Sequence, residues 1–135
     1  MTDPVERALS EITFGTDGLV TAVAQQHDTG EVLMVAWMNR DAVRVTLTEA
    51  RVCYWSRSRQ KLWRKGEESG HFQEVVEIRI DCDRDTVLLR VKQHGDAACH
   101  LGYRSCFFRS REGDGWRTLG EPLFDPAAVY GKPHP

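Results

Sequence analysis

The sequence is short of the features that mark several classes of protein. No apolar run in its 135 residues approaches the roughly 20 residues that a membrane-spanning helix requires. Basic residues do not outnumber acidic ones, because 18 Lys and Arg stand against 20 Asp and Glu and give a net charge of −2. This balance argues against a protein that binds nucleic acid through its overall charge.

The N-terminus also lacks the basic region and the apolar region of a secretory signal peptide. We therefore expect a cytoplasmic protein whose thiols stay reduced. The chain has four cysteines, which are Cys53, Cys82, Cys99 and Cys106. In a reducing compartment they are expected to be metal ligands, a nucleophile or core residues rather than disulfides.

Length and composition favour one globular domain. Hydrophobic residues make up 41% of the chain and charged residues 28%, as in an ordinary soluble domain. No repeat, low-complexity tract or linker interrupts the middle of the chain. We place the domain at residues 10–125, between a flexible N-terminus over residues 1–9 and a loose tail over residues 126–135.

Strand patterns dominate this domain. Strands are expected over residues 19–25, 32–37, 52–56, 73–80, 86–93, 107–109 and 116–119. One clear helix is expected over about residues 39–51, because Asn39 is a good N-cap and apolar residues recur after it at helical spacing. The expected fold class is mainly β (α+β), a small β-rich domain with one helix.

The segment over residues 75–85 predicts a strand whose two faces differ. One face carries apolar side chains and is expected to be buried: Val76, Ile78, Ile80 and Cys82. The other face carries three carboxylates: Asp81, Asp83 and Asp85. Carboxylates at this spacing repel one another unless a cation lies among them, and Mg²⁺ prefers oxygen ligands. The alternative is a solvated acidic turn.

The thiols suggest a different metal. Thiolates are soft ligands that suit zinc, and three protein ligands with one open position are typical of catalytic zinc. Cys99 and Cys106 are separated by six residues of loop-like sequence and, with Cys82, would supply three thiols. Cys53 is interpreted as a buried core residue. His100, next to Cys99, could be a ligand, a support for a ligand or a proton-transfer group.

Residues 56–71 form a basic segment in a slightly acidic chain. Five of the positive charges fall within nine residues, among serines and glycines. Hydroxyls, backbone N–H groups and guanidinium groups suit phosphate oxygens, so a phosphate site is one interpretation. A solvated basic loop is the alternative. An RNA-binding surface is less favoured, because only Trp55 and Trp63 offer stacking surfaces nearby.

Taken together, these motifs resemble the phosphoribosyl-AMP cyclohydrolases, which catalyse the third step of histidine biosynthesis. The resemblance spans about residues 15–112. Its most specific stretches are residues 56–59, 62–67 with 69–71, 81–85, and 99–107. Leu101 departs from the small hydroxyl residue expected at its position.

The resemblance implies two metals and a dimer. Zinc would be held by Cys82, Cys99 and Cys106, and magnesium by Asp81, Asp83 and Asp85. The resemblance also implies an intertwined homodimer in which Cys82 of one chain would join Cys99 and Cys106 of the other. No nucleic-acid or membrane partner is expected.

The resemblance also implies the reaction. The enzyme would hydrolyse the N1–C6 bond of the adenine ring of 1-(5-phosphoribosyl)-AMP, giving the phosphoribosylformimino aminoimidazole carboxamide ribotide through zinc-activated water. His100 is the catalytic candidate for moving the proton. The candidate substrate-binding residues are Ser56, Arg57, Ser58, Arg59, Trp63, Lys65, Gly66, Glu67, Ser69, Gly70 and His71.

Two other functions remain open at this point. One is a zinc-stabilised module that binds nucleic acid or protein through the basic segment. The other is a related cyclohydrolase or deaminase that acts on a different purine nucleotide.

Overall fold

A computed structural model of the chain describes residues 3–124, which contain two helices and eight strands. The helices are α1 (Pro4–Ser10) and α2 (Arg40–Glu49). The strands are β1 (Val20–Gln26), β2 (Val32–Met38), β3 (Cys53–Ser56), β4 (Lys61–Arg64), β5 (Gln73–Ile80), β6 (Thr86–Gln93), β7 (Arg109–Glu112) and β8 (Gly115–Thr118). The predicted β-rich α+β class is confirmed. Neither helix has the length and apolar character needed to cross a bilayer.

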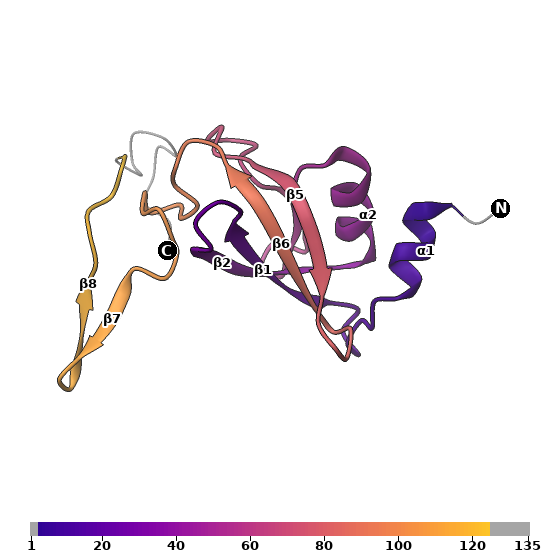
Figure 1. Cartoon of the computed structure of the whole chain (residues 1–135), viewed down its shortest axis with the longest axis horizontal. Coiled ribbons are helices and arrows are strands. Elements are labelled where there is room, and N and C mark those ends of the chain that lie inside the picture. Colours follow the sequence, from indigo (N-terminus) through magenta and orange to yellow (C-terminus); the bar gives the residue numbers. More distant parts are fainter. Residues whose placement is uncertain (1–2, 125–135) are drawn as a thin grey trace.

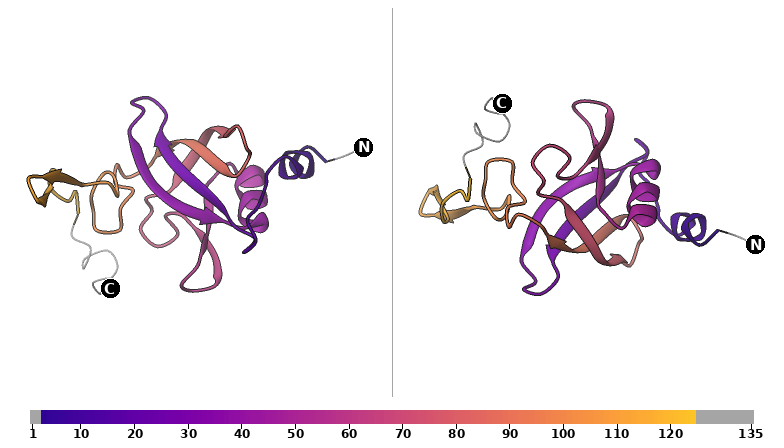
Figure 2. Two further views of the ribbon diagram at one scale, coloured as in Figure 1. Left: turned by 90° about the horizontal axis from the view of Figure 1, so that it is seen from below. Right: turned by 90° about the horizontal axis from the view of Figure 1, so that it is seen from above.

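Four strands form the main sheet, in the order β2-β1-β6-β5 (Figure 1). β1 is antiparallel to β2 and parallel to β6, and β5 is antiparallel to β6. β3 pairs with β4, and β7 pairs with β8, as two separate hairpins. The β7–β8 hairpin projects away from the sheet in every view (Figures 1 and 2). The sheet is therefore the frame on which the connecting loops are placed.

The core lies between one face of the sheet and α2 with β3. Alternate residues of β1 and β6, such as Ala22 and Leu89, have no exposed surface and pack against Val43 of α2 and Tyr54 of β3. Burying one such aliphatic or aromatic side chain stabilises the fold by about 1.5–3 kcal/mol. This shared core fixes β3, and with it the start of the basic segment, against the sheet.

Helix α2 is set by its own capping residues. The Asn39 side chain accepts a hydrogen bond from the backbone N–H of Ala42 at 2.8 Å, and Ala50 ends the helix in the left-handed conformation. The Thr46 hydroxyl donates to the Ala42 carbonyl at 2.8 Å and accepts from the N–H of Cys53 at 2.9 Å. Since this buried hydroxyl joins α2 to β3, the predicted helix also fixes where β3 begins.

The N-terminal segment forms a helix that the sequence analysis did not predict. Asp3 caps it by accepting a hydrogen bond from the N–H of Val5 at 2.9 Å, and Pro4 occupies its first turn. Leu9 is completely buried in the core. We expected residues 1–9 to be flexible, but Leu9, at the end of this segment, packs in the core. The expected tail at residues 126–135 lies outside the described residues.

Strand β5 differs from the expected two-faced pattern. A bulge between Val75 and Glu77 leaves Val76 outside the register with β6 and 53% exposed. Ile78 still packs on the core, whereas Ile80 is 37% exposed. The prediction that Val76, Ile78, Ile80 and Cys82 share one buried face was therefore wrong: the bulge displaces Val76, and Cys82 lies beyond the end of β5, in the exposed turn.

Candidate functional site

A polar cavity of about 360 Å³ lies against the β3–β4 hairpin and the loop that follows it. It is lined by Ser56, Ser58, Arg59, Lys61, Leu62, Trp63, Lys65, Gly66, Glu67, Glu68, Ser69 and His100. Most of the predicted substrate residues and the predicted catalytic histidine thus share one cavity, although His100 is far from the others in sequence. The cavity is also lined by Lys61, Leu62 and Glu68, which were not among the predicted site residues. Each lies between predicted residues in the sequence, which is the signal that could have identified them.

The β3–β4 turn presents hydroxyls and a guanidinium group to this cavity. The Ser56 hydroxyl accepts a hydrogen bond from the N–H of Arg59 at 3.2 Å, and lies 3.4 Å from the Ser58 hydroxyl. Gln60 closes the turn with a φ of +52° and donates from its side chain to the Arg57 carbonyl at 2.7 Å. Segment 61–64 is thus a strand, which was not among the predicted strands.

Arg57 is held outside this cavity. Its guanidinium carbon lies 3.4 Å from the centre of the Trp37 ring, over which it stacks. Together they line a second, more open hollow that also includes Trp55. A cation over an aromatic face is attracted by the electron density of the ring. Arg57 therefore already has an aromatic partner, and its role in phosphate binding stays a prediction.

The loop over residues 65–72 is packed tightly against the turn after β6. A Cβ on Gly95 would clash with the His71 ring, so only glycine allows this approach. The Gln93 side-chain amide donates to the carbonyls of His71 and His94, each at 3.0 Å. Burial and the charge of Lys65 lower the pKa of His71 below its usual value. Gly70 and His71 support the loop from outside the cavity lining.

A buried polar network anchors this loop to the core. The Tyr54 hydroxyl donates to Oε1 of Gln73 at 2.7 Å, and Nε2 of Gln73 donates to Oε1 of Gln93 at 2.9 Å. Within residues 3–124 no buried side-chain nitrogen or oxygen lacks a hydrogen-bond partner. Because such networks are costly to leave half-satisfied, they fix their members in one arrangement. The sequence analysis did not single out Gln73 or Gln93.

Two of the predicted zinc ligands lie together. The thiol of Cys106 hydrogen-bonds to Cys99 and, despite the effect of burial, lowers the pKa of Cys99 to about 6. The same bond raises the pKa of Cys106 above its usual value. The loop between them is closed by the N–H of Cys99 donating to the Tyr103 carbonyl at 3.1 Å. A pair of neighbouring sulfurs, one of them a thiolate, fits a soft divalent metal such as zinc.

The third thiol lies elsewhere in the chain. Cys106 donates its N–H to the carbonyl of Leu33 on β2, whereas Cys82 is exposed in the turn after β5. β2 and β5 are the opposite edges of the sheet, three strand spacings of about 4.8 Å apart, or about 14 Å. Figure 1 shows the β5–β6 turn and the segment after β6 at opposite ends of the sheet. Two sulfurs on one zinc ion lie within about 4.6 Å of each other, so one chain does not bring the three thiols together.

Cys53 is separate from these thiols. It is completely buried in β3, as expected of a core residue. Burial raises the pKa of its thiol. It therefore contributes to packing against α2.

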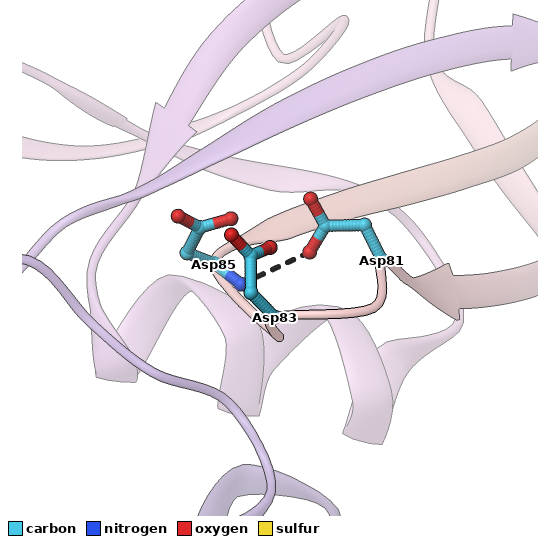
Figure 3. A group of neighbouring side chains, drawn as sticks. All are labelled: Asp81, Asp83 and Asp85. Atoms are coloured by element: carbon cyan, nitrogen blue, oxygen red, sulfur yellow. Dashed lines mark hydrogen bonds between the residues drawn. The ribbon is translucent and has the colours of Figure 1, made fainter.

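The three predicted magnesium ligands converge in the turn between β5 and β6 (Figure 3). Asp81, Asp83 and Asp85 each have a ligand atom within 4.8 Å of the others, and all three are exposed. Asp81 accepts hydrogen bonds from the N–H groups of Asp85 at 3.1 Å and Thr86 at 3.2 Å. Hydrogen bonds to Asp85 and Asp81 raise the pKa of Asp83. Clustered carboxylate oxygens fit a hard cation such as Mg²⁺, and within residues 3–124 no other such group of three forms.

The fold and the cavity together describe a small α+β protein whose cavity is lined by hydroxyl, guanidinium and ammonium groups and by His100. Comparison with known proteins gives a more specific answer. The sequence model of the family "Phosphoribosyl-AMP cyclohydrolase" matches residues 34–108. A phosphoribosyl-AMP cyclohydrolase of Pseudomonas savastanoi pv. phaseolicola (strain 1448A / Race 6) is 56% identical over 126 residues, covering 93% of this chain and 97% of that relative. One of Pseudomonas aeruginosa (strain UCBPP-PA14) is 57% identical over 122 residues, covering 90% of this chain and 91% of the relative.

The chain belongs to the phosphoribosyl-AMP cyclohydrolase family, and it is an enzyme. The resemblance found in the sequence motifs is confirmed. The roles of the individual residues, the metals and the dimer stay predictions, and they are developed below.

Proposed function

We propose that this enzyme opens the adenine ring of phosphoribosyl-AMP by hydrolysing the bond between N1 and C6, as a step in histidine biosynthesis. The observation that carries the proposal is the shared cavity. It joins a serine- and arginine-bearing turn, the loop over residues 66–69 and His100 around a volume of about 360 Å³. Its exposed donors suit phosphate, while Trp63 offers an aromatic wall to a purine ring.

In this proposal the β3–β4 turn binds one phosphate of the substrate. Ser56 and Ser58 supply hydroxyl donors, and Arg59 supplies a guanidinium group that can bind two phosphate oxygens at once. The loop from Gly66 to His71 closes over the ligand, with Glu67 and Ser69 on the cavity wall. Arg57 supports the turn by stacking on Trp37.

His100 is proposed as the group that moves the proton. Hydrolysis adds water to C6 and breaks the C6–N1 bond, so a proton leaves the water and N1 gains one. His100 lines the cavity, and an imidazole ring can both accept and donate a proton. The ring is already electrophilic, since the ribosyl group on N1 makes it cationic.

Cys82, Cys99 and Cys106 are proposed to hold zinc. When bound, zinc supplies a Lewis acid and lowers the pKa of water towards 7. The contact between Cys99 and Cys106 supports this assignment. Free thiols suit the reducing cytoplasm, where we propose that the enzyme works.

A homodimer is proposed because one chain holds the thiols at opposite edges of its sheet. A second copy can bring its Cys82 to the Cys99–Cys106 pair, and a twofold axis would then create two equal sites. The projecting β7–β8 hairpin also leaves Trp116 64% exposed and Phe107, just before it, 58% exposed. Exposed aromatic side chains of this kind are common at protein interfaces.

Asp81, Asp83 and Asp85 are proposed to hold magnesium close to Cys82. The three carboxylates lie in the β5–β6 turn together with Cys82. Within one chain they are therefore separated from the cavity in the same way as Cys82. In a dimer that completes the zinc site, the acidic turn of one chain would approach the cavity of the other. The cation would then neutralise the carboxylates beside a phosphorylated substrate.

Incubation of the purified protein with phosphoribosyl-AMP, zinc and magnesium tests the proposal. We expect the aminoimidazole carboxamide product to form and its ultraviolet absorbance to rise. Adenosine monophosphate without the N1-ribosyl group is the matched control, and a deaminase of other purine nucleotides would act on it. No product from phosphoribosyl-AMP would refute the proposed function.

Removal of zinc separates this function from that of a zinc-stabilised binding module. The hydrophobic core includes Tyr54 and Leu89 but none of the three proposed zinc ligands. We therefore expect a chelator to abolish turnover while circular dichroism keeps most of its signal, and added zinc to restore turnover. Unfolding on chelation, without turnover beforehand, would favour the binding module.

A further inference from the structure

Lys65 lines the cavity but is almost completely buried, and its ammonium group is already bonded to the protein. It follows β4 directly, and its backbone N–H donates to the Val52 carbonyl at 3.1 Å. The residue is only 6% exposed, and its Nζ donates to the Ala98 carbonyl at 2.6 Å. Its ammonium group therefore joins the basic segment to Ala98, which lies 33 positions further along the chain than Lys65 and directly before Cys99.

The surroundings of this ammonium group are unusual for a lysine. A buried positive charge is costly unless an opposite charge or a set of acceptors compensates it. Within residues 3–124, no carboxylate lies within ion-pair distance of Lys65. The Trp63 ring lies 5.5 Å from Nζ and contributes a cation–π contact. Burial lowers the pKa of Lys65, and the nearby Cys106 and Cys99 oppose that shift.

The backbone around Ala98 shows what the contact with Lys65 does. Ala98 and Cys99 are both buried, and their N–H groups donate to the carbonyls of Arg104 and Tyr103, each at 3.1 Å. These bonds fold the loop back so that Cys99 and Cys106 meet. The Lys65 bond fixes the carbonyl of Ala98 on the remaining side. The position of the Cys99 sulfur is thus set jointly by the loop and by Lys65.

We propose that Lys65 is a positioning residue for the metal rather than a phosphate ligand: its buried ammonium group holds the Ala98 backbone that presents Cys99, and it offsets the charge that Cys99 and Cys106 would carry when they hold a metal. This inference rests on the proposed zinc site. A zinc ion with three thiolates carries a net charge of −1, and a buried cation beside it offsets that charge. Lys61, which is exposed in the same cavity wall, has no such contact and is free to meet phosphate.

Metal binding by the full-length chain tests the proposal. Metal-free wild type, Lys65→Met, Lys65→Arg and Lys61→Met would be titrated with cobalt(II), with the sulfur-to-cobalt charge-transfer absorbance as the signal. Groups that support metal ligands typically contribute 10–100-fold to affinity. We therefore expect Lys65→Met to weaken cobalt binding at least tenfold, Lys65→Arg to recover part of the loss, and Lys61→Met to bind like wild type.

Steady-state kinetics at saturating zinc provide the second measurement. We expect Lys65→Met to lower kcat while its KM for phosphoribosyl-AMP stays within twofold of wild type. A Lys65→Met protein that binds cobalt like wild type but has a tenfold higher KM would overturn the proposal and make Lys65 a phosphate ligand. A lower urea midpoint of the metal-free variant, with unchanged metal affinity, would reduce Lys65 to a structural residue and overturn it equally.

The wild-type arm separates failure of this inference from failure of the proposed function. If wild type shows no charge-transfer band and no turnover, the zinc assignment fails and this inference fails with it. If wild type shows both, and only the Lys65→Met results contradict the expectation, this inference alone is wrong. If Lys65→Met does not fold, Lys65→Arg replaces it in the test. A Lys65→Arg protein with wild-type cobalt affinity and a raised KM for phosphoribosyl-AMP would also refute the proposal.

Discussion

Substitution of Gly95 by alanine tests how the loop that closes the cavity is held. Gly95 lies in the turn after β6 with a φ of +81°, and its Cα faces the His71 ring. A Cβ built there would lie 2.7 Å from Cγ and 2.8 Å from Nε2 of that ring, besides clashing with Cδ2. Ordinary carbon contacts are about 3.5–4.0 Å, so the ring must move by about 1 Å.

Two costs add up in this variant. A non-glycine residue in the left-handed region costs about 1–2 kcal/mol. Overpacking a well-filled contact costs about 1–3 kcal/mol more. We therefore expect Gly95→Ala to lower the free energy of unfolding by about 2–5 kcal/mol. Displacement of His71 would also break its edge contact with Phe124, whose ring centre lies 4.9 Å away, and shift the loop.

Gly30→Ala is the matched control. Gly30 has nearly the same φ, +79°, but the nearest atom to its Cβ would be Nε2 of Gln25, at 3.9 Å. It therefore carries the backbone cost of about 1–2 kcal/mol without the clash. The difference between the two variants isolates the contact with His71.

Urea unfolding followed by circular dichroism gives both stabilities, and KM for phosphoribosyl-AMP reports the loop. We expect Gly95→Ala to be less stable than Gly30→Ala by about 1–3 kcal/mol and to have a raised KM. Equal losses of stability, with KM unchanged in both variants, would refute the account of the loop.

Three further predictions concern the cavity and its neighbours. Arg59→Ala should raise KM for phosphoribosyl-AMP about 10–100-fold, because a charge-assisted hydrogen bond contributes about 1.5–3 kcal/mol. Arg57→Ala should have a smaller effect on KM. Equal KM values for the two variants would remove Arg59 from the phosphate site. Cys99→Ala should abolish both bound zinc, measured by elemental analysis, and turnover, and surviving activity would contradict the metal assignment. The pKa of His71 is lowered in the folded state, so the neutral ring stabilises the fold above its unfolded pKa of about 6.5, and this contribution is lost as the pH falls below that value. The urea midpoint should therefore drop between pH 7 and pH 5 more in wild type than in His71→Asn. Parallel curves for the two proteins would disprove this.

Much of the fold follows from local signals in the sequence. The spacing after Asn39 predicted α2, and strand patterns predicted β1, β2, β3, β5, β6 and the final hairpin to within a few residues. α1 was missed because only its last turn carries a buried side chain, although Asp3 and Pro4 are a recognisable helix start. β4 was missed because its charged and aromatic residues were assigned to a phosphate loop.

The site was less predictable, because its geometry depends on tertiary packing. Motifs identified the residues around the cavity, but periodicity alone placed Cys82 on a buried face. β5 ends at Ile80, so Cys82 falls in the exposed turn that follows it, and the bulge at Val76 depends on how β5 pairs with β6. The buried position of the Lys65 ammonium group depends on the carbonyl of Ala98, which no local pattern in the sequence could bring to it.

Turnover of phosphoribosyl-AMP before and after removal of zinc tests the central claim most directly. The account predicts formation of the aminoimidazole carboxamide product by the zinc-loaded enzyme with magnesium, loss of that activity in chelator, and recovery when zinc is returned. No product under any of these conditions, or full activity in the metal-free protein, would contradict it.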